Sequence, residues 1–119
     1  MNDYWGYHLM LDCGRCSISA VTNPETITKF AKTLVERIDM VAYGEPQVVH
    51  FGKEEKTGYT LIQLIETSNI AAHFIDQNGD AYLDVFSCKR FDIEVVKATV
   101  EEFFGPETLK INYLERQTY

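Results

Sequence analysis

The stretch that decides the fold is Ser68-Asn69-Ile70-Ala71-Ala72-His73, which a short turn joins to Ala81-Tyr82-Leu83-Asp84-Val85-Phe86-Ser87-Cys88. Both halves have the residue content of a strand. Asn78-Gly79 lies between them, and this dipeptide is a strong signal for a hairpin turn. The sequence therefore predicts two adjacent antiparallel strands that carry a serine, a histidine and a cysteine.

The residues before this hairpin predict, in chain order, a first strand, a helix and two further strands. Tyr4 to Asp12 alternates polar and apolar residues and Gly14 ends the pattern, which indicates a strand followed by a loop. Asn23-Pro24-Glu25 is a helix start, because Asn can cap and Pro suits the first helical position. The apolar residues that follow recur at helical spacing at Ile27, Phe30, Ala31, Leu34, Val35 and Ile38. Strands are predicted at 47–51 and 59–65, with a charged turn between them.

The residues after the hairpin predict a second helix and a closing strand. Asp92 caps the helix, Gly105-Pro106 ends it, and Thr108 to Leu114 form the strand. Two amphipathic helices with a mostly antiparallel sheet predict an α+β two-layer sandwich with both helices on one face. The other sheet face also carries apolar residues, which predicts an interface there.

Composition narrows the class of protein. A chain of 119 residues predicts a single domain, 1–119, and 45% apolar residues are typical of a soluble globular protein. The net charge of −7 argues against a nucleic-acid partner and favours a cationic small molecule. There is no apolar run of membrane-spanning length, so we expect no membrane association and a cytoplasmic protein.

The cysteines indicate neither a disulfide framework nor a metal site. There are three of them, an odd number. Cys13 and Cys16 form a Cys-x-x-Cys pair, but a structural zinc site needs four ligands and no second pair exists. We therefore expect no bound metal and interpret the pair as two thiols in the loop after the first strand.

The hairpin resembles the self-processing region of the bacterial S-adenosylmethionine decarboxylase proenzymes. In that family a Glu-Ser pair precedes a short strand ending in His, and the next strand reads Ala-x-Val-Asp-Val-Phe-Thr-Cys, similar to residues 81–88 here. Gly6-Tyr7-His8-Leu9-Met10-Leu11-Asp12 is similar to the family's first strand, Gly-x-His-Leu-x-x-Asp. The order of helices and strands agrees along nearly the whole chain. The resemblance implies a homodimer that packs sheet against sheet.

The resemblance also implies a chemistry. Self-cleavage between Thr67 and Ser68 would give residues 1–67 and 68–119, with Ser68 converted to a pyruvoyl group that serves as the electron sink for decarboxylation. His73 matches the histidine that removes the Ser68 α-proton, work suited to an imidazole with a pKa near neutrality. Cys88 matches the cysteine that protonates the substrate carbon, and Thr60 the hydroxyl that assists self-cleavage. His73 and Thr60 are expected to serve Ser68 of the partner subunit.

The sequence departs from the family pattern near the predicted substrate contacts. Thr67 stands where the family has Glu, which places Glu66 one position earlier and, by alternation, on the opposite strand face unless a bulge re-aims it. Gln77 replaces the Glu that binds the ribose hydroxyls, and it can hydrogen-bond without charge assistance. We take Gln77, Glu66 and Phe51 as substrate-binding candidates. The aromatic residues Trp5, Tyr7, Phe51, Tyr59 and Phe74 are expected to lie in the core or an interface.

Three functions follow. The first is pyruvoyl-dependent decarboxylation of S-adenosylmethionine for spermidine synthesis, which suits an acidic chain and a sulfonium substrate. The second keeps the pyruvoyl chemistry but takes arginine or ornithine, for which the altered ribose contact is not needed. The third is an unprocessed, non-catalytic homologue that binds a ligand or activates a catalytic partner, and the missing Glu at position 67 motivates it.

Overall fold

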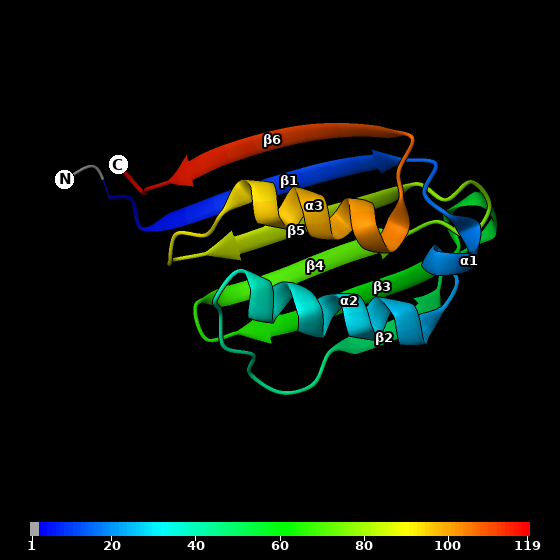
Figure 1. Ribbon diagram of the computed structural model, residues 1–119, viewed down its shortest axis with the longest axis horizontal. Coiled ribbons are helices and arrows are strands. Elements are labelled where there is room, and N and C mark those ends of the chain that lie inside the picture. Colours follow the sequence, from blue (N-terminus) through cyan, green and yellow to red (C-terminus); the bar gives the residue numbers. More distant parts are fainter. Residues whose placement is uncertain (1–2) are drawn as a thin grey trace.

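A computed structural model describes residues 3–119, and within them the chain forms one six-stranded antiparallel sheet with the order β2-β3-β4-β5-β1-β6 (Figure 1). The strands are β1 Gly6–Gly14, β2 Gln47–Phe51, β3 Gly58–Ile65, β4 Ser68–Phe74, β5 Ala81–Ser87 and β6 Thr108–Arg116. The helical elements are α1 Ile18–Val21, α2 Pro24–Arg37, α3 Ile93–Phe104 and the 3-10 turn η1 Glu54–Lys56. The predicted α+β two-layer sandwich is confirmed.

Local sequence explains where α2 and α3 begin and end. The Asn23 side chain accepts hydrogen bonds from two backbone N–H groups of the first turn of α2, and Pro24 takes its first position. Asp92 caps α3 in the same way. Gly105 ends α3 at φ 53°, a left-handed conformation that glycine adopts without a steric penalty. Both predicted helix starts are confirmed. Among residues 3–119, no helix has the length and apolar character needed to cross a membrane.

The helices α2 and α3 lie across one face of the sheet, which we call the inner face (Figure 1). Along β4 the alternate side chains Ile70, Ala72 and Phe74 are buried on this face. They pack into a core with the apolar faces of both helices, including Ile27, Phe30, Leu34, Val96, Val100 and Phe104. The opposite, outer face keeps exposed apolar side chains at Val49, Phe51, Leu64, Tyr82 and Leu114.

The first strand begins two residues later than predicted, at Gly6 instead of Tyr4. Gly14, which the sequence predicts as the end of the strand, is its last residue. The pairing with β6 continues as far as the Gly14 and Thr108 pair, so the whole strand to Gly14 belongs to the sheet.

Two loops also differ from expectation. The segment after β1, predicted as a loop, contains α1, because the backbone N–H groups of Cys16 and Ser17 bond to the carbonyls of Gly79 and Phe104 at 2.9 and 2.8 Å. These contacts anchor the segment against a distant loop and the end of α3. The predicted turn at Asn78-Gly79 is confirmed, but it lies within a longer connection from residue 75 to 80.

Candidate active site

The predicted cleavage site lies in a tight turn that joins β3 to β4. Residues 66 and 67 form the turn, and Ser68 begins β4 with a φ of 149°. Outside glycine, such a backbone conformation costs on the order of 1–3 kcal/mol. The other non-glycine residues of positive φ in the described chain lie at 51–59°, in the ordinary left-handed region. Backbone strain is therefore concentrated at the serine predicted to be cut.

Hydrogen bonds hold Thr67 through both its carbonyl and its hydroxyl group. The carbonyl oxygen accepts a hydrogen bond from the Cys88 N–H at 2.9 Å. Thr67 Oγ1 accepts one from the Ser87 hydroxyl at 2.8 Å and donates to the Met40 sulfur at 3.2 Å. Ser87 is completely buried and also accepts from the Lys89 N–H at 2.9 Å. The acyl side of the predicted cleavage site is thus bonded to the end of β5.

The segment that follows α2 supports the same turn from another side. The Glu66 N–H donates to the Val41 carbonyl at 2.8 Å. Lys89 Nζ donates to the Asp39 carbonyl at 2.6 Å, which ties this segment to the residues after β5. Two chain segments, the residues after α2 and the end of β5, therefore converge on the turn and restrict its movement.

His73 lies near the far end of β4, on the outer face. The register pairs it with Thr60 of β3 and with Tyr82 of β5. Thr60 Oγ1 and His73 Nδ1 are hydrogen-bonded at 3.1 Å. The His73 side chain is exposed to solvent. The structure thus brings together Thr60 and His73, both of which the sequence places in the site.

Ser68 and His73 do not meet within one chain. They are five steps apart along β4, and at about 3.3 Å per residue this separates their Cα atoms by about 17 Å. A histidine side chain cannot span that distance. One chain therefore presents two half-sites at opposite ends of β4. We call Thr67, Ser68 and Cys88 the Ser68 half-site, and Thr60 and His73 the His73 half-site.

The predicted substrate-binding residues divide between the two half-sites. Glu66 belongs to the turn before β4, where its side chain is exposed, and it leaves the strand alternation through this turn and not through a bulge. Phe51 pairs with Gly58 and is 58% exposed, and Gln77 lies in the loop after β4. Phe51 and Gln77 are therefore at the end of the sheet that carries the His73 half-site. A single chain does not gather all three around one point.

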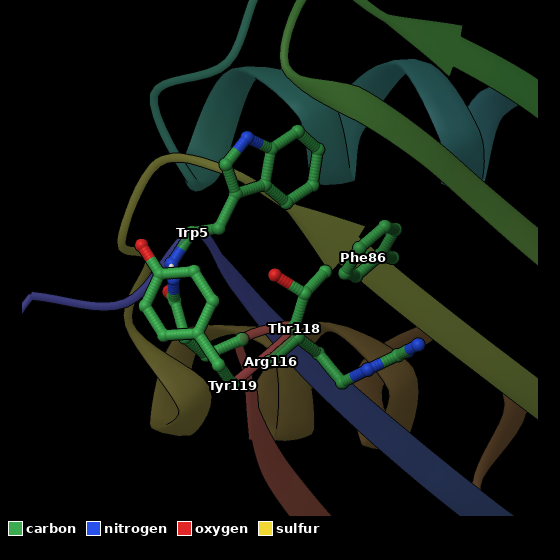
Figure 2. Close-up of a pocket in the computed structure, with 6 residues that line it drawn as sticks. Trp5, Phe86, Arg116, Thr118 and Tyr119 are labelled. Atoms are coloured by element: carbon green, nitrogen blue, oxygen red, sulfur yellow. Dashed lines mark hydrogen bonds between the residues drawn. The ribbon is translucent and has the colours of Figure 1, made fainter.

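A cavity of about 540 Å³ lies between the two ends of the chain and β5 (Figure 2). Its walls include Trp5, Phe86 and residues 116–119. The Trp5 and Phe86 ring centres are 5.9 Å apart, and the Arg116 guanidinium lies 5.2 Å from the Phe86 ring centre. Phe86 pairs with Asn69, the second residue of β4. The cavity therefore lies on the outer face, next to the start of β4.

Sequence patterns do not reveal this cavity. They predict Trp5 as a core or interface residue, and at 59% exposure it does not lie in the core of the chain. The backbone N–H of Trp5 donates to Gln117 Oε1 at 2.9 Å, a contact between the two ends of the chain. The one usable signal is Phe86, an aromatic residue on the outer face of the quoted strand. Its neighbours come from the pairing of β1 with β6, which has no local signature.

The two remaining histidines, His8 and His50, are predicted to be structural, and each contacts a carboxylate. His8 Nε2 is 3.1 Å from Asp84 Oδ1, while Arg116 donates to His8 Nδ1 at 3.2 Å. Because a guanidinium can only donate, His8 is held with its proton on Nε2. His50 Nε2 is 2.6 Å from Asp76 Oδ2. These contacts cross-link neighbouring chain segments and involve neither half-site.

Cys13 and Cys16 are both buried, and Cys13 lies in β1 instead of the predicted loop. Their thiols share a hydrogen bond. This bond is the main cause of the raised pKa of Cys13, to which burial adds, and of the lowered pKa of Cys16. Cys88, by contrast, is exposed. Within residues 3–119, no group of three His, Cys, Asp or Glu side chains is placed to hold a metal ion.

The fold defines the class of protein: an α+β sandwich of one six-stranded antiparallel sheet with helices across one face. The chain belongs to the S-adenosylmethionine decarboxylase family, whose family model matches residues 7–117.

Comparison with known proteins agrees with this membership. The S-adenosylmethionine decarboxylase proenzymes of Clostridium botulinum strains Loch Maree (type A3) and Langeland (type F) are each 27% identical over 100 residues, covering 83% of this chain and 83% of the relative. The crystal structure of the adenosylmethionine decarboxylase from Aquifex aeolicus VF5 superimposes with a TM-score of 0.81 at 18% identity, covering 98% of this chain and 94% of that one. The structural match confirms the fold.

Proposed function

We propose that this chain is the precursor of a pyruvoyl-dependent decarboxylase. In this proposal it cuts itself between Thr67 and Ser68 and then acts on S-adenosylmethionine, in the route to spermidine. The observation that carries the proposal is the strained Ser68, with a φ of 149°, beside a carbonyl that the Cys88 N–H holds at 2.9 Å. Membership of the family supports the choice of reaction.

The first step of self-cleavage uses groups of the Ser68 half-site. The Ser68 hydroxyl oxygen attacks the Thr67 carbonyl carbon, the C–N bond breaks, and the hydroxyl proton ends on the nitrogen, which becomes a free amine. The Thr67 acyl group is left as an ester on Ser68. Negative charge develops on the Thr67 oxygen during the attack, and the Cys88 N–H is placed to stabilise it. Breaking the peptide bond also releases the strain at Ser68, which favours the ester.

The second step needs a base. Removal of the Ser68 α-proton expels the Thr67 carboxylate and leaves dehydroalanine, and water then displaces its nitrogen as ammonia to give the pyruvoyl group. An imidazole suits this proton transfer because its pKa lies near neutrality. When His73 Nδ1–H donates to Thr60 Oγ1, the lone pair of His73 Nε2 is available for the proton.

This base must come from a second copy of the chain, because about 17 Å separates Ser68 from His73 along β4. A two-fold axis near Ala71, midway between the half-sites, superimposes the Ser68 half-site of one chain on the His73 half-site of the other. The outer face, with its exposed apolar side chains, is the surface that such a dimer would bury. We therefore propose a homodimer in which two sheets face each other.

The residues around Ser68 fit a pyruvoyl group made from that serine. Ser68 is half-buried at the start of a strand, and the exposed Cys88 thiol belongs to the residue bonded across the same turn. The group supplies an electron sink for the electron pair that remains when carbon dioxide leaves. In the proposal, Cys88 returns a proton to the substrate carbon. The pairing of Ser68 with Ser87, the residue before Cys88, keeps Cys88 close to the new chain end.

S-adenosylmethionine is the substrate that the site supports best. A net charge of −7 favours a sulfonium cation, and the cavity between the chain ends and β5, about 540 Å³, is of the size that small-molecule sites have. We propose Glu66, Phe51 and Gln77 as substrate contacts from the two joined half-sites. The neutral Gln77 favours a second candidate, arginine or ornithine, because neither needs a charged partner for ribose hydroxyls.

Release of labelled carbon dioxide tests this assignment. Purified protein is incubated separately with carboxyl-labelled S-adenosylmethionine, arginine and ornithine. We expect release from S-adenosylmethionine alone. Release only from arginine or ornithine would move the enzyme to the second substrate class. No release from any of them, with the chain uncut, would leave a non-catalytic ligand-binding or activating role.

A further inference from the structure

We propose that Ser87 is a positioning residue for self-cleavage: through the hydroxyl of Thr67 it fixes the carbonyl that Ser68 attacks. The inference rests on the proposed function, because it concerns the first step of that reaction. Ser87 does not touch the reacting atoms. It acts through Thr67, whose Oγ1 accepts a hydrogen bond from the Ser87 hydroxyl at 2.8 Å.

The first support is the burial of Ser87. Its exposed fraction is 0%, in a sheet whose inner face is otherwise mainly apolar. A hydroxyl group buried in this way needs hydrogen-bond partners, since leaving it without them costs free energy. Ser87 has Ser68 as its neighbour in the β4 to β5 register, yet its side chain bonds to Thr67. The polar group is therefore directed at the acyl side of the scissile bond.

The second support is the direction of the hydrogen bonds. The Lys89 N–H donates to Ser87 Oγ at 2.9 Å, Ser87 donates to Thr67 Oγ1, and Thr67 donates to the Met40 sulfur at 3.2 Å. Each hydroxyl accepts one bond and donates the next. The Met40 sulfur is a second acceptor for the Ser87 hydroxyl, but at 3.8 Å it is more distant than Thr67 Oγ1 at 2.8 Å. Lys89 Nζ is in turn bonded to the Asp39 carbonyl at 2.6 Å, which anchors the chain at the residue before Met40.

The third support is that Thr67 is held at two points by consecutive residues. Ser87 bonds its side chain, and the Cys88 N–H bonds its carbonyl oxygen at 2.9 Å. Together these contacts fix both the side chain and the peptide plane of Thr67. With Thr67 fixed, Ser68 is the residue that takes the strained φ of 149°. The orientation of the Thr67 carbonyl is therefore set when the Ser68 hydroxyl approaches it.

The inference predicts which step slows when the contact is lost. In that step the Ser68 oxygen bonds to the Thr67 carbonyl carbon, the C–N bond breaks, and the hydroxyl proton passes to the nitrogen. The later removal of the α-proton does not involve the Thr67 hydroxyl. Loss of the contact should therefore slow the formation of the ester and should not let the ester accumulate.

The test follows conversion of the intact chain into two fragments by denaturing mass spectrometry. Ser87→Ala and Thr67→Val should each slow conversion about tenfold, the effect of one well-placed hydrogen bond. Thr67→Ser keeps the hydroxyl and should restore the rate to within about threefold of wild type. Thr99→Val is the matched control, because it removes a buried hydroxyl that bonds the Val95 carbonyl inside α3, and it should process at the wild-type rate.

Hydroxylamine at neutral pH separates a positioning role from a general loss of structure, because it cleaves esters under conditions milder than those that cut peptide bonds. Any cut at Asn78-Gly79, the peptide bond of this chain that alkaline hydroxylamine attacks, is told apart by its fragment masses. His73→Ala should accumulate an ester that hydroxylamine cuts, whereas Ser87→Ala and Thr67→Val should accumulate none. Wild-type rates in both variants, or a hydroxylamine-sensitive ester in either, would overturn the inference and leave the proposed function intact. Wild-type protein that never cuts would overturn both. If Ser87→Ala does not fold, the half-buried Thr67→Val decides the question alone.

Discussion

The two half-sites at the ends of β4 are built in opposite ways. At the Ser68 half-site, Thr67 is bonded to residues from two other segments, and the supporting Ser87 is fully buried. At the His73 half-site, Thr60 and His73 bond to each other, and the imidazole lies exposed on the outer face. One half-site holds a peptide bond in a fixed geometry, and the other presents an imidazole on the outer face, where in the proposed dimer it would act as a base for the partner chain.

This difference shows that one sheet can hold a strained peptide bond at one end of a strand and an exposed imidazole at the other end. The peptide bond must be fixed before it rearranges, and the hydrogen bonds that fix it come from other segments of the same chain. The base has no such requirement, because its substrate is a strand of another chain in the proposed dimer. Four predictions test this division of labour.

Ser68→Ala should have the largest effect. Without the hydroxyl there is no nucleophile for the Thr67 carbonyl, so the chain should remain whole at all times. Denaturing mass spectrometry of the purified variant checks this, with Ser19→Ala, an exposed serine of α1, as the control that should process normally. Fragments of residues 1–67 and 68–119 in the Ser68→Ala variant would show that cleavage does not use this hydroxyl.

Co-expression of Ser68→Ala with His73→Ala should restore processing that neither variant shows alone. In a mixed dimer, the His73→Ala chain keeps its Ser68 and receives an intact His73 from the other chain. Random pairing of the two chains makes about half of the dimers mixed, so about half of the His73→Ala chains should be cut. The two chains differ in mass, which identifies the one that is cut. No restoration would show that the half-sites do not combine between chains.

Leu64→Glu should separate the two half-sites by breaking the dimer. Leu64 lies on the outer face and is 48% exposed, so the charge of a glutamate at this position would be buried between the two sheets of the proposed dimer. Sedimentation should show a monomer, and processing should stop at the ester because the base is missing. Ile18→Glu, at 45% exposure in α1, is the matched control and should remain dimeric. Normal processing by a Leu64→Glu monomer would place the whole reaction in one chain.

Thr60→Val should have the smallest effect of the four. It removes one hydrogen bond from His73, a loss of about 0.5–1.5 kcal/mol, and should slow the second step by up to about tenfold. Thr60→Ser should behave like the wild type. Ester accumulation, measured with hydroxylamine, is the relevant quantity, since the hydrogen bond orients the base. An unchanged rate in Thr60→Val would limit Thr60 to a structural role.

The sequence predicts most of the fold because each element carries a local signal. Asn23 and Asp92 mark the helix starts, and strand content and Asn78-Gly79 mark the central hairpin. The family resemblance also indicates Thr60 and His73, which the structure places in contact. What local patterns cannot supply is pairing between distant segments. The pairing of β1 with β6 joins opposite ends of the chain, and α1 depends on contacts with the ends of other elements.

The supporting contacts of the site follow the same rule. Ser87 and Met40 approach Thr67 from β5 and from the segment after α2, and nothing in the intervening sequence indicates that they meet. The cavity between Trp5, Phe86 and the C-terminal residues likewise joins both ends of the chain. The family resemblance therefore indicates the candidate reacting residues, while the residues that contact them appear only in three dimensions.

The central claim is that the Thr67 to Ser68 bond rearranges into a reactive carbonyl. The most direct measurement is the denatured mass of freshly purified wild-type protein, before and after treatment with borohydride. The account predicts two fragments, residues 1–67 and 68–119, with the second lighter by one ammonia than its plain hydrolysis product and reducible by borohydride. A single chain of 119 residues that stays whole and does not react would contradict it.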